Sequence, residues 1–161
     1  MATPPPPPKK PVHRHSVTAL LWEYNDFQMY LCAVNASTLV KCASVARADE
    51  DPKKGYQRLL SERRARDIAA YIDDGNVVPP SLVLSAAESA NLKFDEEPRK
   101  LTFDLAPHAF LIIDGQHRLF GASKAKSDVP MSVVIMTGLQ LEQEVQYFLD
   151  INGTQRGVPR T

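Results

Sequence analysis

The residues best suited to chemistry follow the continuous apolar run 109–113 and are Asp114, Gly115, Gln116, His117 and Arg118. A buried strand that ends in a glycine turn and starts a helix is an anion-binding arrangement, because the first helical N–H groups lack acceptors and carry partial positive charge. Gly115 lets the backbone approach a phosphate, and Arg118 can bind two phosphate oxygens at once. The string therefore predicts a phosphate site, with a salt-bridged strand end as the alternative.

Two side chains of this string, His117 and Asp114, are the candidate catalytic residues. His117 can donate a hydrogen bond or move a proton near neutral pH. Asp114 can hold a metal ion, orient a water or pair with Arg118. If a nucleotide is hydrolysed at this turn, positioning and charge neutralisation supply most of the catalysis.

A second basic feature lies upstream, where six basic residues are opposed only by Glu62: Lys53, Lys54, Arg58, Arg63, Arg64 and Arg66. Such density creates a local positive field, and all of them except Arg58 are candidate DNA contacts; a solvated helix face is the alternative. Nineteen basic residues balance nineteen acidic ones over the whole chain. A freestanding DNA binder usually carries net positive charge, so we expect DNA to be reached through a local patch or through a partner.

Composition excludes several other classes of protein. Cys32 and Cys42 form no CxxC pair, which predicts buried reduced thiols rather than a zinc site or a redox pair. No apolar run approaches the roughly 18 residues that a membrane span requires. The N-terminus has five consecutive prolines and no apolar core of a secretory signal. We therefore expect a cytoplasmic protein.

The periodicity of apolar residues predicts a mixed α+β domain over residues 16–161, preceded by a disordered, proline-rich tail over residues 1–15. Strands are expected at 17–24, 27–34, 82–85, 101–105, 109–113 and 129–136, and the first two form a hairpin around Asn25-Asp26. Residues 86–100 are expected to form an exposed polar excursion. The length suits one compact domain.

Helices are expected over 35–47, 61–73 and 119–126, and a last helix is expected directly after Thr137. The second is the clearest, because its apolar residues share one stripe and Ser61 can cap its N-terminus, with Gly75 just beyond its end. Thr137 and Gln140 are expected to form a capping box before the last helix. On that helix one face is shared by Leu141, Val145, Phe148 and Leu149.

Three strings, in this order along the chain, carry a family resemblance: Gly55-Tyr56-Gln57-Arg58, Ile112 to Arg118, and Asn152-Gly153-Thr154-Gln155-Arg156. Over roughly residues 30–156 the chain resembles the DGQHR-domain (DndB-like) branch of the ParB/sulfiredoxin-like superfamily. The resemblance implies a ParB/sulfiredoxin-like mixed sheet with flanking helices. It also implies that the turn at Asp114–Arg118 holds the phosphates of a nucleotide.

The resemblance extends the set of candidate nucleotide-binding residues to Tyr56, Gln57, Arg58, Gly115, Gln116, Arg118, Asn152, Gln155 and Arg156. In ParB-like proteins a Glu-Asn pair helps to hold magnesium, and here Ile151 stands where that glutamate would be. Glu144 and Asp150 are the candidate substitutes for that glutamate, so the sequence leaves open whether magnesium is a cofactor. Sulfiredoxins carry a reactive cysteine where this chain has Gln116, which excludes their sulfinyl-transfer chemistry.

The leading hypothesis is a nucleoside-triphosphate-binding module, with ATP favoured and hydrolysis open, that acts in DNA modification (phosphorothioation), its regulation or phage defence. The first alternative is a non-enzymatic, DNA-binding transcriptional regulator. The second is metal-dependent DNA nicking. Relatives with these motifs are commonly longer, so we expect a fragment or a minimal version, and the oligomeric state is open.

Overall fold

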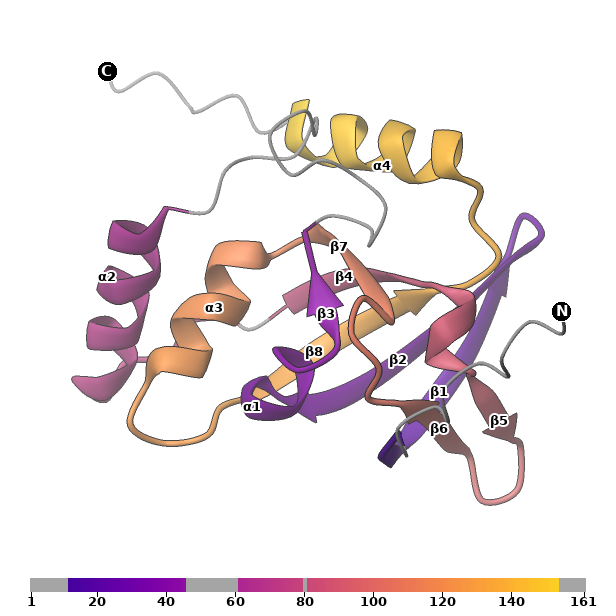
Figure 1. The fold of residues 1–161 in the computed structure, drawn as a ribbon, viewed down its shortest axis with the longest axis horizontal. Coiled ribbons are helices and arrows are strands. Elements are labelled where there is room, and N and C mark those ends of the chain that lie inside the picture. The colour runs from indigo at the N-terminus through magenta and orange to yellow at the C-terminus, as the bar shows by residue number, and fades with distance from the viewer. Residues whose placement is uncertain (1–11, 46–60, 80, 154–161) are drawn as a thin grey trace, which may run out of the picture.

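The computed structural model describes residues 12–45, 61–79 and 81–153. Within them eight strands form one curled sheet in the order β3-β7-β4-β8-β2-β1-β6-β5, drawn in Figure 1. The strands are β1 (Arg14–Tyr24), β2 (Phe27–Asn35), β3 (Ala43–Ser44), β4 (Ser81–Ala86), β5 (Lys93–Asp95), β6 (Lys100–Asp104), β7 (Phe110–Asp114) and β8 (Pro130–Met136). The helices are α1 (Ala36–Leu39), α2 (Glu62–Asp73), α3 (Gln116–Lys124) and α4 (Leu141–Gly153), with a 3₁₀ turn, η1 (Glu88–Ala90).

The sheet is mixed, as the sequence predicted. β4 runs parallel to β8 and β3 parallel to β7, whereas the other neighbours are antiparallel. The hairpin of β1 and β2 turns at Asn25 and Asp26, whose φ angles of 46° and 66° are the left-handed ones expected of this pair. The α+β class is therefore confirmed. No helix of the described residues is long and apolar enough to cross a membrane.

Alternation along β7 divides the interior into two hydrophobic layers. Phe110 and Ile112 belong to the main core, which also includes Leu39 of α1 and Leu119 of α3. Leu111 and Ile113 point the other way and pack against Phe148 of α4. Because successive side chains of a strand face opposite sides, α4 covers the face of the sheet opposite to α1 and α3 (Figure 1).

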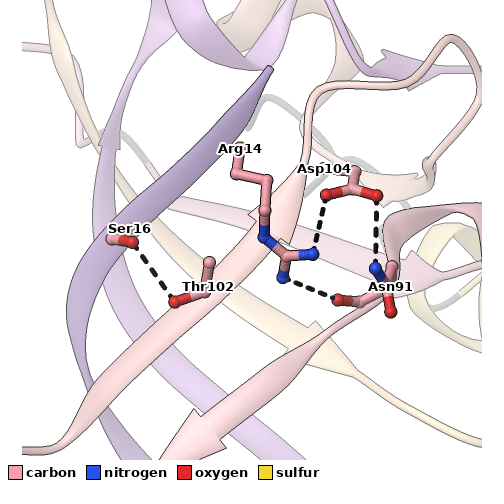
Figure 2. A network of polar contacts seen from close by, with 5 residues as sticks. All are labelled: Arg14, Ser16, Asn91, Thr102 and Asp104. Carbon is pink, nitrogen blue, oxygen red and sulfur yellow. Dashed lines mark hydrogen bonds and ion pairs between the residues drawn. The ribbon is translucent and has the colours of Figure 1, made fainter. Parts of the chain in front are cut away.

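Polar contacts fasten the first residues of β1 to β6 (Figure 2). The Arg14 guanidinium forms an ion pair with Asp104 at 3.2 Å, and its Nη2 donates to the carbonyl of Asn91. Ser16 and Thr102 share a hydrogen bond between their hydroxyls, while the ring of His15 packs against Phe103. The strand therefore begins at Arg14, three residues before the predicted Val17, and includes two residues that the sequence assigned to the tail.

Three expected elements differ from the structure. The predicted helix 35–47 is helical only over α1 and continues into β3, which pairs with β7. The predicted helix 119–126 begins earlier, at Gln116, directly after the glycine. The polar excursion 86–100 contains η1 and β5, and β5 pairs with β6. Only in the first case does a strand distant in the sequence, β7, decide the local conformation.

The start of α4 was also predicted incorrectly. Thr137 donates from its hydroxyl to the carbonyl of Gln28, so it anchors the chain to β2 instead of capping the helix. The N–H of Gln140 donates to Oε1 of Gln143, and the N–H of Glu144 donates to the carbonyl of Gln140. A half capping box therefore lies three residues later than expected.

The predicted buried face of α4 is confirmed at Phe148 but not at its two leucines. Leu141 and Leu149 are exposed, whereas Glu144 and Phe148 are buried and Ile151 packs with the second core. The inner face of α4 includes Glu144, a polar residue that no apolar pattern selects, so it is rotated from the predicted face.

Candidate functional site

The corner between β7 and α3 turns at Gly115, whose φ of +98° lies in the left-handed region. A Cβ at this position would lie 2.5 Å from Cδ2 of Leu82 and 2.9 Å from the carbonyl oxygen of Ser81. Glycine is therefore required by close contact with β4 as well as by its backbone conformation. The sequence analysis predicted that Gly115 lets a phosphate approach the backbone. In the structure, the absence of its side chain allows β4 to pack against the corner.

Arg118 is tied to both strands at this corner. Its Nη2 forms an ion pair with Oδ2 of Asp114 at 2.8 Å, and its Nε donates to the carbonyl of Ser81 at 3.0 Å. The side chains of Arg118 and Asp114 are 30% and 23% exposed. The salt-bridged strand end, the alternative from the sequence, is therefore present. The Arg118 side chain is therefore paired but only partly buried.

His117 joins the start of α3 to the start of α2. Its Nε2 accepts a hydrogen bond from the backbone N–H of Ser61 at 3.0 Å. Ser61 is the predicted N-cap of α2, and its hydroxyl accepts from the N–H of Arg64. The hydrogen bond thus holds the first turn of α2, which carries Arg64, against the start of α3.

The two helices cross closely at Gly121 of α3. A Cβ there would lie 2.5 Å from Cγ2 of Ile68 and 3.0 Å from the carbonyl oxygen of Ala65. The stripe predicted for α2 from Ala65, Ile68, Ala69 and Ile72 is the face that packs on α3, and it is confirmed. All three arginines of α2 are exposed, but Arg64 alone among them lines the cavity at the corner, whereas Arg63 and Arg66 do not.

A cavity of about 90 Å³ opens at the corner. All five residues from Asp114 to Arg118 line it, together with Arg64, Ile68 and Phe148 and with Asn152 of α4. Ligand pockets usually measure about 300–1,000 Å³. The described residues therefore enclose a space that suits one anionic group better than a whole nucleotide.

The structure brings together only part of the predicted site. Asn152 lies at the cavity, where its Nδ2 donates to the carbonyl of Phe148, so its side chain is held by its own helix. The other predicted contacts lie outside the described residues: Lys53, Lys54, Tyr56, Gln57, Arg58, Gln155 and Arg156. Of the predicted site residues, the Asp114–Arg118 turn and Asn152 line one cavity, together with Arg64, which the sequence had assigned to DNA contacts.

The two candidate substitutes for a magnesium ligand lie elsewhere on α4. The carboxylate of Glu144 is 2% exposed and accepts a hydrogen bond from the hydroxyl of Ser85 at 2.6 Å. Asp150 is exposed and accepts from Nε2 of Gln146. Among the described residues no group of three histidine, cysteine or acidic side chains is placed to hold a metal.

Sequence reasoning did not find the Ser85–Glu144 pair. Ser85 was read as the end of a short strand and Glu144 as a candidate metal ligand. The sequence did contain a sign of this pair. Phe148 and Ile151 follow Glu144 by four and seven residues, so all three side chains share the helix face that packs on the sheet.

Comparison with known proteins gives one match. The family model described as DndB, DNA-sulfur modification-associated, matches residues 17–159. No curated protein and no solved structure matches the chain.

Proposed function

Because the chain belongs to the DndB family of DNA-sulfur modification-associated proteins, and so to DNA phosphorothioate modification systems, we propose that its β7–α3 corner binds a nucleotide phosphate in that setting. A nucleoside triphosphate is the proposed ligand, with ATP favoured. The supporting observation is the cavity at the corner, because arginines from two helices and an amide from a third meet at the start of α3.

The electrostatics of the corner favour an anion. Asp114 offsets the charge of Arg118, which leaves the charge of Arg64 and the partial positive charge at the N-terminus of α3. Gly115, the N-cap residue of α3, makes no side-chain hydrogen bond to the first turn of the helix. We assign Arg64 as the principal cationic contact. Arg118 is a positioning residue whose partly exposed side chain also lines the cavity.

Binding fits this corner better than turnover does. Both candidate catalytic side chains have protein partners, since Asp114 pairs with Arg118 and His117 accepts from Ser61. Either would have to leave its partner before acting as a base. Magnesium would enter on the triphosphate oxygens, with Asp114 as the nearest carboxylate of the cavity.

The test is a titration with ATP, CTP and GTP, with and without magnesium, of the unaltered chain and two arginine variants. Arg64→Ala should weaken binding about 10-fold or more, because it removes a charge-assisted hydrogen bond. Arg63→Ala is the matched control, since Arg63 lies on the same turn of α2 but does not line the cavity. Equal loss in both variants, or no binding by any nucleotide at millimolar concentration, would contradict the proposal.

DNA binding by α2 is the second candidate function. Arg63 and Arg66 are exposed on this helix, away from its buried alanines, so both can reach phosphates of a duplex. Such contacts predict binding that weakens steeply with salt. A gel-shift series with the Arg63→Ala, Arg66→Ala double variant tests it, and unchanged affinity and salt dependence would reject it.

A further inference from the structure

One half of β1 has an unpaired edge. β6 pairs with β1 from Arg14 to Thr18, and the last bond between them runs from the N–H of Ala19 to the carbonyl of Arg99 at 2.9 Å. From Leu20 to Tyr24, β1 pairs only with β2 among the described residues. Backbone groups alternate between the two edges of a strand, so the N–H and C=O of Leu21 and Glu23 point away from β2, as those of Ala19 do.

The side chains along this edge are apolar and exposed. Leu20, Trp22 and Tyr24 are 53%, 52% and 61% exposed, and Leu31 of β2, which lies opposite Leu20, is 36% exposed. They share one face of the sheet because they alternate along the strand. Natural proteins usually protect such an edge, and a contiguous apolar patch beside it marks an interaction site.

A hollow of about 500 Å³ runs along the same edge. Its apolar walls come from Leu20, Trp22 and Phe94. Its charged rim holds three carboxylates, Glu23, Glu96 and Glu97, against the single guanidinium of Arg99. The local charge is therefore negative although the whole chain is neutral.

We propose that an extended, lysine- or arginine-bearing segment of another protein adds to β1 as a further strand at Leu20–Tyr24. Its backbone bonds to Leu21 and Glu23, every second side chain lies on the Leu20–Trp22–Tyr24 stripe, and its basic groups face the three carboxylates. Main-chain bonds supply affinity in this mode, whereas side chains and charge supply selectivity.

Charge argues against two other occupants. A second copy of this chain would bring Glu23, Glu96 and Glu97 toward their own equivalents across a two-fold axis. The chain's own N-terminal segment carries Lys9 and Lys10, but the run Pro4–Pro8 has no N–H groups to donate to the edge. The occupant is therefore a basic segment with donors along its length.

The probe for the test is a blocked heptapeptide of alternating lysine and valine. Trp22 is the only tryptophan of the chain, so its fluorescence reports occupancy of the stripe. The peptide should shift the Trp22 emission to the blue and slow the hydrogen exchange of the Leu21 and Glu23 amides. A version N-methylated at alternate residues should bind at least tenfold more weakly, because it lacks the donors.

Charge reversal tests the selectivity. The Glu96→Lys, Glu97→Lys variant should bind the lysine–valine peptide at least tenfold more weakly, whereas reversing two exposed carboxylates outside the hollow, Glu88 and Glu142, should change nothing. Four results would overturn the proposal: no binding at millimolar peptide, equal binding of a glutamate–valine peptide, self-association that itself shifts Trp22, or binding that appears only after residues 1–11 are removed.

Discussion

The β7–α3 corner and the β1 edge differ in what the protein leaves for a ligand to satisfy. At the corner, side chains from α2, α3, β4 and β7 bond to one another and leave a small cavity with surplus positive charge. At the edge, the backbone from Leu20 to Tyr24 pairs with no strand other than β2 in the part of the chain that the structure describes, and the rim is negative. The charge that lines each region therefore decides the chemistry of its proposed ligand. The positive corner suits an anion, and the acidic edge suits a basic polypeptide.

The largest expected effect concerns the glycine on which the corner depends. Gly115→Ala should lower the free energy of unfolding by about 3 kcal/mol or more, because it adds a clash with Leu82 to a left-handed φ. Gly75→Ala is the matched control, since its φ is +87° but no atom lies within 4 Å of the added Cβ. Urea denaturation measures both, and an equal cost would show that the contact with β4 does not constrain the corner.

A smaller effect is expected where α4 is held above the sheet. Ser85→Ala removes a hydrogen-bond donor from the buried side chain of Glu144 and should cost about 1–3 kcal/mol, the penalty for a buried polar group that loses its partner. Ser16→Ala, which loses an exposed hydroxyl pair, should cost about 0.5 kcal/mol or less. If both variants melt alike, Glu144 is not the group that positions Phe148 and Asn152 at the cavity.

The pH dependence of the free energy of unfolding tests whether solvent reaches the two thiols. Burial raises the pKa of Cys32 to about 11 and that of Cys42 to about 12, from 9.0. At pH values between 9.0 and the raised pKa of each thiol, the folded state binds more protons than the unfolded state. The contribution of each thiol to the free energy of unfolding is therefore fully present below pH 9 and is lost as the pH rises. Each thiol should contribute a loss of roughly 1 kcal/mol by pH 10. A Cys42→Ala variant should lose less between pH 8 and pH 10, and an identical loss would argue that the thiol is accessible.

The smallest effect is expected at the edge. Leu20→Thr should change the free energy of unfolding by about 0.5 kcal/mol or less, because the side chain is exposed and threonine suits a strand. The same substitution should weaken binding of the lysine–valine peptide, which Trp22 fluorescence measures. A cost of about 1.5 kcal/mol or more, seen in thermal unfolding, would mean that the stripe is already covered, and the contrast with the corner would fail.

Local patterns predicted much of the framework. The stripe, cap and terminating glycine of α2 all lie within one short segment, and so do the hairpin residues Asn25 and Asp26. The strand–glycine–helix corner was also predicted, because a buried apolar run followed by glycine is a local signal. The family was predicted from the same corner together with the motifs on either side of it.

Contacts between distant segments were not predictable in this way. The start of β1 depends on Arg14 and Asp104, which are ninety positions apart and carry no apolar signal. The rotation of α4 depends on Ser85 bonding to Glu144, a polar pair that patterns of apolar residues assign to the surface. The unpaired half of β1 could not be foreseen, because the register at which β6 stops pairing is set by the turn before it.

The order of neighbouring residues was enough to predict the α+β class, the family and the glycine corner. The folded chain was needed to show that Arg118 bonds to Asp114 and Ser81, that Arg64 of α2 lines the cavity, and that an acidic hollow lies along β1. The physical reason is that hydrogen bonds, charges and strand edges act over a few ångströms in space, whatever the separation of the residues along the chain.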